Sequence, residues 1–239
     1  MGRDTIVLLH ASVWAVNDCG DVDVSRGAKY DHGAAHYLFF QNFFSDLGAT
    51  QTQSGKSNLP SEVLFVVALC AVGLGMVGSS SSWKVIAGNN CVGAGWGVTA
   101  QVFSLLSGAC FIGVGVTPWN LVLAAHNAFV KAAFLLLMGF LISITMLQVR
   151  NGWPGRYTIC DWIYLVLLAA YLYILLHGPR LDTERGLAIQ VAAQKIIVYA
   201  SILNLGHQAL GIRRGALEAS KKNEELRAAP VNRSSLLSR

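Results

Sequence analysis

Five long apolar stretches constrain this 239-residue chain more than any other feature of its sequence. A bilayer core of about 30 Å requires about 20 mostly apolar residues per helix, and each stretch approaches or exceeds that length with one lysine or none inside it. Only 13% of the residues are charged, against roughly 25% in a soluble domain. The sequence therefore predicts an all-α, polytopic transmembrane bundle with spans near Ser61–Trp83, Gly95–Pro118, Trp119–Val149, Ile159–Leu176 and Leu187–Ile212.

An additional apolar run, from Ile6 to Val16, is too short to cross a bilayer as an ordinary helix. It fits a signal-peptide core, a short helix that tilts or thins the bilayer, or the remnant of a longer helix that starts upstream of Met1. Arg3 is the only basic residue before the run, and no small-x-small signal-peptidase cleavage site follows it. We favour a short or truncated first helix, which gives a bundle of about six helices over residues 1–212.

The distribution of basic residues predicts the orientation of this bundle, because cytoplasmic segments carry the excess of Lys and Arg. With six helices and both termini cytoplasmic, most basic residues fall inside and the segment of about 17–60 lies outside. The tail, residues 213–239, is expected to be basic and to pass from helix to disorder. The net charge of +5 thus reflects membrane topology, and no nucleic acid partner is expected. The inside set is Arg3, Lys84, Arg150, Arg156, Arg213, Arg214, Lys221, Lys222, Arg227, Arg233 and Arg239.

Small residues indicate how two of the helices meet, since close backbone packing drives helix association in lipid. We expect the second and third spans to pack tightly, with a connecting loop that includes Ser79–Ser82 and the Asn89–Asn90 pair. The same small-residue faces would also suit a homo-oligomer. The residues concerned are Gly73, Gly75 and Gly78 in one span, and Gly93, Gly97, Ser104 and Gly108 around the next.

Polar residues inside the spans indicate function, because an ionisable group in hydrocarbon usually faces a bundle interior or a cavity. Lys131 shares a helix with His126 and Asn127, and Lys195 follows Gln194 in a polar stripe along the last span. One interpretation is a pocket for a lipid head group or a small anionic solute, with Asp46 as counter-charge; the other is that the lysines snorkel or form a structural ion pair. The candidate binding residues are Asp46, His126, Asn127, Lys131, Gln194 and Lys195, and the stripe comprises Gln190, Gln194, Ser201, Asn204 and Gln208 with His207 beside it.

Two histidines have a spacing that could suit a metal site. His32 and His36 have the i, i+4 spacing of a helical zinc motif, but the Glu of that motif is absent. A catalytic zinc would need a third ligand, for which Asp46, His126 or His207 are the candidates. We predict no metal, cofactor or catalytic residue. A metal-dependent lipid hydrolase and a purely structural or assembly protein remain the alternatives to a lipid- or solute-binding protein.

Two segments carry a family resemblance. The run Asn42-Phe-Phe-Ser-Asp-Leu-Gly48, followed by Pro60 and a helix, resembles the signature after the first helix of bacterial domain-of-unknown-function family 998. The run Gly113-Val-Gly-Val-Thr-Pro-Trp-Asn120, with His126 further on, is similar to that family's Gly and Pro turn, although Asn120 stands where an acid is expected. A more distant likeness extends to the eukaryotic DRAM, Frag1 and Sfk1 proteins. The resemblance implies a six-helix protein of unassigned biochemistry in a bacterial plasma membrane.

Overall fold

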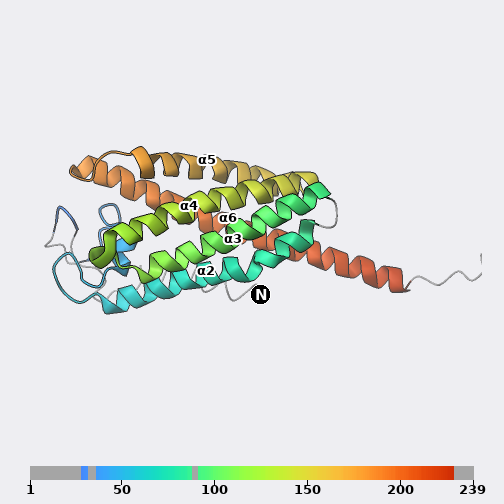
Figure 1. Cartoon of the computed structure of the whole chain (residues 1–239), viewed down its shortest axis with the longest axis horizontal. Helices are drawn as coiled ribbons and strands as arrows, with labels where there is room; N and C mark the ends of the chain where they lie inside the picture. The colour runs from blue at the N-terminus through green and yellow to red at the C-terminus, as the bar shows by residue number, and fades with distance from the viewer. Residues whose placement is uncertain (1–27, 32–35, 88–90, 229–239) are drawn as a thin grey trace, which may run out of the picture.

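The computed structural model describes residues 28–31, 36–87 and 91–228, and its fold is all-α, as predicted (Figure 1). The predicted first helix, at residues 6–16, lies outside the described residues, so the total of six helices stays a prediction. In chain order, the described elements are the 3-10 helix η1 (Phe44–Gly48) and the α-helices α2 (Leu59–Ala87), α3 (Cys91–Val116), α4 (Trp119–Arg150), α5 (Gly155–His177) and α6 (Glu184–Ala228).

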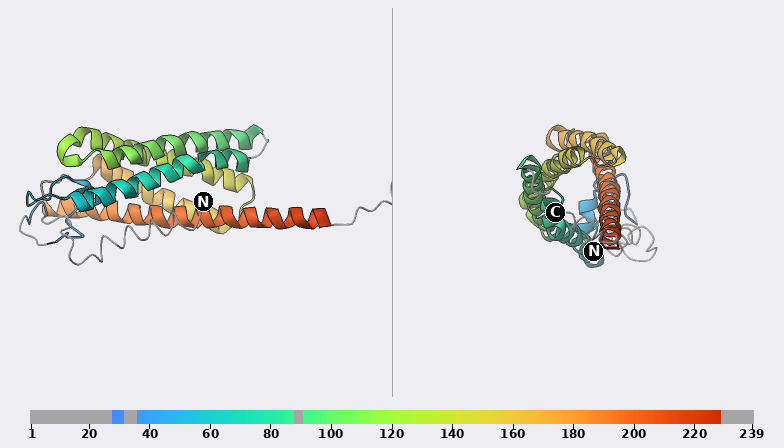
Figure 2. Two further views of the ribbon diagram at one scale, coloured as in Figure 1. Left: turned by 90° about the horizontal axis from the view of Figure 1, so that it is seen from below. Right: turned by 90° about the vertical axis from the view of Figure 1, so that its right-hand side faces the viewer.

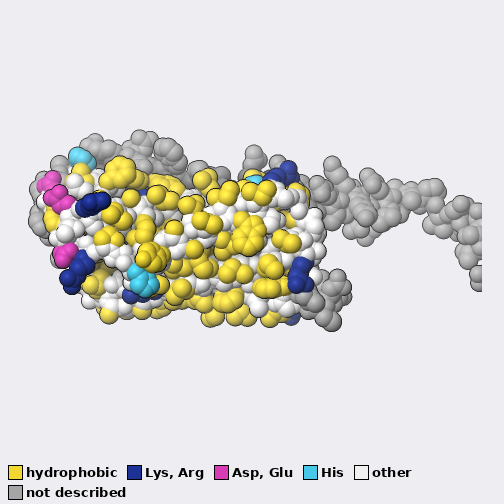
Figure 3. All heavy atoms as spheres, turned by 90° about the horizontal axis from the view of Figure 1, so that it is seen from above, with side chains coloured by type: hydrophobic (Ala, Val, Ile, Leu, Met, Phe, Trp, Pro, Cys, Tyr) yellow, Lys and Arg dark blue, Asp and Glu magenta, His cyan; other side chains and the backbone are white. Residues whose placement is uncertain are grey.

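Within the described residues, five helices are long and apolar enough to cross a membrane, and they coincide with the five predicted stretches. On the face seen in Figure 3, hydrophobic side chains cover the middle while charged ones gather toward the two ends. The chain is accordingly an integral membrane protein. Helix α5 differs from prediction, because it begins at Gly155 rather than near Ile159. Helix α6 continues through the basic stretch after Ile212 as far as Ala228, where the tail was expected to begin as helix.

Each helix from α2 to α6 packs against the next in sequence. Seen along the bundle, the five helices form an arch with α2 and α6 at its two ends, and η1 lies between those ends (Figure 2). We call the end of the bundle that contains η1 the η1 end, where Tyr30 Oη also donates a 2.9 Å hydrogen bond to the carbonyl of Leu181. The opposite end is the tail end, where Asn151 Nδ2 bonds the carbonyl of Ile86 at 3.0 Å.

The predicted tight contact of α2 and α3 is confirmed. A Cβ added at Gly73 would collide with the carbonyl oxygen of Gly108, and one added at Gly108 would lie 2.7 Å from the carbonyl oxygen of Gly73. Ser104 Oγ donates to the carbonyl of Met76 at 2.8 Å across the same interface. Because lipid offers no water to drive the helices together, this backbone-to-backbone approach supplies much of their attraction.

Ser79–Ser82 do not form a loop, contrary to our prediction, but continue helix α2. Ser79 Oγ donates to the carbonyl of Gly75 at 2.8 Å, and Ser80 Oγ to the carbonyl of Val77 at 2.7 Å. A serine hydroxyl bonded to its own preceding turn exposes no unpaired polar group. A run of serines therefore does not need to leave the helix in an apolar environment.

The glycines of α2 offer a matched test of this packing. Gly73→Ala should lower the free energy of unfolding by about 1–3 kcal/mol, because the added methyl meets backbone atoms of α3 that cannot give way. Gly75→Ala is the control, since nothing lies within 4 Å of a Cβ at that position; it should leave stability unchanged or raise it by at most about 1 kcal/mol. Thermal unfolding in detergent micelles measures both, and equal effects of the two substitutions would contradict the close contact.

Candidate functional site

One buried amide fixes η1 to the start of α2. Asn58 has no exposed surface, and its Nδ2 donates to the carbonyls of Asp46, Leu47 and Ala49 at 3.3, 3.1 and 2.8 Å. Ser61 Oγ adds a 3.0 Å bond to the carbonyl of Leu47. A short 3-10 helix leaves many of its carbonyls without backbone partners, and these side chains supply the missing donors.

Two further side chains connect this segment to the other helices. Gln194 Oε1, on α6, accepts a 2.8 Å bond from the backbone N–H of Phe44. Asn120, on α4, accepts from the N–H of Thr50 at 3.2 Å and donates to Thr50 Oγ1 at 2.7 Å. Segment 44–50 is thus bonded to α2, α4 and α6, and it covers the space between them at the η1 end.

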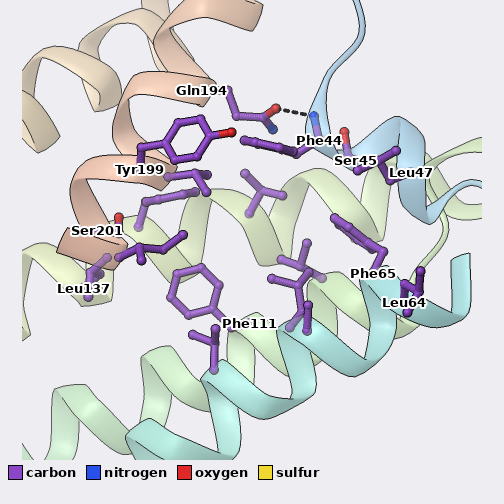
Figure 4. A pocket seen from close by; sticks show the side chains of 18 of the residues that line it. Phe44, Ser45, Leu47, Leu64, Phe65, Phe111, Leu137, Gln194, Tyr199 and Ser201 are labelled. Carbon is purple, nitrogen blue, oxygen red and sulfur yellow. Dashed lines mark hydrogen bonds between the residues drawn. The ribbon is translucent and has the colours of Figure 1, made fainter. Parts of the chain in front are cut away.

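Beneath η1 lies a cavity of about 190 Å³. Four helices and η1 contribute its wall, which is almost entirely aliphatic and aromatic, and the close-up shows side chains from α2, α3, α4 and α6 converging on it (Figure 4). Polar groups border it chiefly toward η1. Principal lining residues are Phe44, Ser45 and Leu47; Phe65, Ala68, Val72 and Met76; Phe111 and Val114; His126, Val130 and Phe134; and Gln194, Val198, Tyr199, Ser201 and Leu205.

Lys195 is buried behind the aromatic wall of this cavity, with 3% of its surface exposed. Its Nζ donates to Tyr37 Oη and lies 3.7 Å from the ring centroid of Phe44, with the rings of Tyr37 and Phe39 at 4.5 and 4.6 Å. The faces of aromatic rings attract cations, and more strongly where water is excluded. The ammonium therefore helps to hold the aromatic segment that faces the cavity, and Lys195 is not among the cavity-lining residues.

Asp46 lies in η1 with 8% of its surface exposed. Its Oδ2 accepts hydrogen bonds from the backbone N–H of Phe43 at 2.9 Å and from Asn42 Nδ2 at 3.2 Å. Burial raises the pKa of this carboxyl to about 6, outweighing the opposing effects of these bonds and of the positive charge on Lys195. Burial also raises the pKa of the Tyr37 hydroxyl.

The structure brings only some of the predicted binding residues together. Asp46, Gln194 and Lys195 gather around η1, and His126 lines the cavity while its Nδ1 lies 2.7 Å from the carbonyl oxygen of Thr117. Asn127 and Lys131 are exposed on α4 and do not line the cavity. The two lysines thus do not face a shared cavity.

The histidine candidates for a metal site are also separated. His36 is exposed, and His32 lies outside the described residues. Among the residues that the structure describes, no three His, Cys, Asp or Glu side chains are grouped closely enough to hold a metal ion.

The predicted polar stripe of α6 is confirmed as a row of hydrogen-bonding side chains. Gln190 Nε2 bonds the carbonyl of Pro179 at 2.6 Å, and Ser201 Oγ lies 2.6 Å from Tyr164 Oη. Asn204 and Gln208 both bond Asp161, a buried acid of α5 that the sequence analysis did not single out. The sequence does mark this residue, because Asp161 is the sole acid in the fourth apolar stretch. With the helix expected to start near Ile159, however, Asp161 resembles a residue at the end of a helix.

Comparison with known proteins adds no further guide to the site. No family model, no curated protein and no solved structure matches the chain.

Substitutions at Asn58 and at its exposed neighbour Ser57 test whether the Asn58 amide holds η1 in place. Asn58→Leu keeps most of the side-chain volume but removes the Nδ2 donor that bonds the carbonyl of Ala49 at 2.8 Å. An unpaired buried carbonyl costs about 1–3 kcal/mol, so the unfolding temperature should fall and amide hydrogen exchange should accelerate in 44–50. Ser57→Ala should change neither quantity. Unchanged exchange in Asn58→Leu would show that η1 is held by other contacts.

Proposed function

We propose that this integral membrane protein binds a lipid and takes one apolar chain into the cavity beneath η1. The observation that supports the proposal is the composition of the cavity wall. Ligand sites are typically concave and mainly apolar, with a few polar groups that fix orientation. Here Phe65, Val72, Phe111 and Phe134 represent the apolar majority, and Gln194 is among the polar groups at the η1 end.

The size and lining of the cavity favour a hydrocarbon over water or an anion. An apolar cavity of about 150 Å³ can remain dry and bind an aromatic hydrocarbon, and this cavity is somewhat larger. The ammonium of Lys195 contacts the rings of Tyr37, Phe39 and Phe44. Among the described residues that line the cavity, none is a lysine or an arginine. An anion within it would therefore lack a direct cationic partner.

The head group of the lipid belongs, in this proposal, at the η1 end. Ser45, Gln194 and Tyr199 border the cavity there, and Asp46 and Lys195 lie in the same region. With both termini cytoplasmic, as the basic residues predict, this is the outer side of the membrane. The resemblance to family 998 fits a six-helix protein of this kind, and we propose that the chain belongs to that family.

Lateral entry from the bilayer suits the arrangement of the helices. Among the described helices, both α2 and α6 contribute to the cavity wall, yet they stand at opposite ends of the arch (Figure 2) and do not form a packed pair. We place the route of the lipid chain between these two helices. η1 would then close the site toward the aqueous side, leaving the chain in contact with hydrocarbon along its path.

Adjacent residues of α2 provide the test. Ala68 lines the cavity, whereas Val67 is 60% exposed and does not. Ala68→Phe places a ring inside the cavity and should reduce the lipids retained by the protein by one per chain. Val67→Phe adds a ring of the same kind to the outer surface and should retain the wild-type number. Native mass spectrometry of protein released from nanodiscs counts the retained lipids, with extracted lipids identified separately.

Circular dichroism and thermal unfolding would first establish that both variants are folded. A folded Ala68→Phe protein that retains as many lipids as wild type, and of the same kinds, would contradict the proposal. Loss of lipid in both variants to the same extent would also contradict it, since the lipid would then be bound at the outer surface.

A further inference from the structure

Asp161 is a fully buried carboxyl group away from the proposed lipid site. It has no exposed surface and lies six residues beyond Gly155, the first residue of α5, hence about 9 Å along the helix from its start. Ionisable groups at such depth are costly and generally functional. Its neighbours come from α4 and α6, toward the tail end of the bundle.

The groups bonded to this carboxyl are neutral. Asn204 Nδ2 and Gln208 Nε2 donate to Oδ1 at 2.7 and 2.5 Å. Gln148 and Thr145 of α4 are the other two residues that interact with it. Within the described part of the chain, no lysine, arginine or histidine nitrogen lies within ion-pair distance of it. A negative charge here would have amide dipoles but no cation to balance it.

The other titratable groups in this region are engaged elsewhere. On α6, the ring of His207 packs 4.6 Å from that of Tyr157 on α5, and Arg156 lies over the same Tyr157 ring at 5.0 Å. Tyr164 Oη pairs with Ser201. The two residues of α4 that face Asp161, Thr145 and Gln148, do not titrate.

The two oxygens of the carboxyl are not equivalent. Oδ1 accepts two short bonds, whereas among the described residues Oδ2 has a single, long contact, with Thr145 Oγ1 at 3.5 Å. A hydroxyl has one proton to donate, and that of Thr145 is directed to the carbonyl of Leu141 at 2.7 Å. Within the described residues, Oδ2 thus accepts no short hydrogen bond, and Thr145 Oγ1 retains free acceptor capacity.

An independent observation indicates a missing donor at this place. Gln148 is 1% exposed. Its Nε2 donates to Gln208 Oε1 at 2.6 Å, but its own Oε1 is buried and has no hydrogen-bond partner among the residues that the structure describes. Buried acceptors without partners are uncommon and call for an explanation. A single proton on the carboxyl, shared between Gln148 Oε1 and Thr145 Oγ1, would give both of them a donor.

We propose that Asp161 is an intramembrane proton-binding site, with the proton on Oδ2 and with Thr145 and Gln148 as its acceptors. Uptake forms one O–H bond on Oδ2 with a proton from hydronium in the water at the tail end, and release returns that proton to water. A proton fits better than a sodium ion, because the N–H groups of Asn204 and Gln208 point at the carboxyl, where a metal cation would need oxygens. The site is separate from the lipid cavity and does not depend on it.

Infrared difference spectroscopy of the full-length protein in nanodiscs, recorded as the pH is changed, tests the proposal. Wild type should show the carbonyl band of a buried, protonated carboxylic acid that disappears reversibly as the pH rises. Asp161→Asn, which resembles the protonated acid in shape and charge, should lack this band. Asp46→Asn is the control, because it removes the buried acid of η1 and should leave the Asp161 band in place.

Thr145→Val gives a second readout that does not require removal of the acid. It leaves the carboxyl in place and removes one acceptor, so the band should shift in frequency; if Asp161→Asn fails to fold, this variant carries the test. A band that persists in Asp161→Asn, a band unmoved by Thr145→Val, or no titrating band in folded wild type would each overturn the proposal. Replacement of the band by a carboxylate signal on addition of sodium at constant pH would also overturn it, in favour of a metal cation.

Discussion

The hydrogen bonds that hold η1 between the ends of the helical arch are the constraint on which the cavity depends. A membrane protein must satisfy its backbone polar groups within itself, and only a continuous α-helix does so locally. A 3-10 segment at the end of the bundle therefore requires hydrogen-bond partners from its neighbours. On the α2 side, Asn58 and Ser61 donate to the carbonyls of Ala49 and Leu47, and on the α6 side Gln194 accepts from the backbone N–H of Phe44. Because η1 occupies this position, α2 and α6 line a common space without packing together as a pair.

Helix α6 organises two chemically opposite environments along its length. Near η1, the cation of Lys195 is surrounded by aromatic faces; toward the tail end, Asn204 and Gln208 surround the carboxyl of Asp161 with amides. Neither charge is paired directly with its opposite in the described residues. Burial of a charge is costly unless something compensates it, and each site uses a different compensation: ring quadrupoles in the first, hydrogen bonds and, in our proposal, a proton in the second. Along α6, the cavity-lining residues Val198, Ser201 and Ile202 lie between these two environments.

The sequence was sufficient for features that depend on local pattern. Apolar length predicted the spans, the small residues of the second and third spans predicted a close helix contact, and the polar spacing along α6 predicted its hydrogen-bonded stripe. Features that depend on rotation of a helix or on distant partners were not predictable: Lys131 and Lys195 both interrupt apolar runs, yet one is exposed and the other buried. Asn58 resembles a loop residue until its three carbonyl partners are known, and Asp161 gained importance only when α5 proved to start at Gly155.

The central claim is that the bundle holds a lipid chain in an apolar cavity closed by η1. A cryo-electron microscopy map of the protein in lipid nanodiscs, enlarged with a bound antibody fragment, tests it most directly. If the cavity holds a lipid chain, the map should show continuous, chain-shaped density between α2 and α6. This density should contact Ala68, Val72 and Val198 and end beneath Phe44 of η1. If the map instead showed α2 packed directly on α6, with side chains filling the space and no density for a chain, the claim would be contradicted.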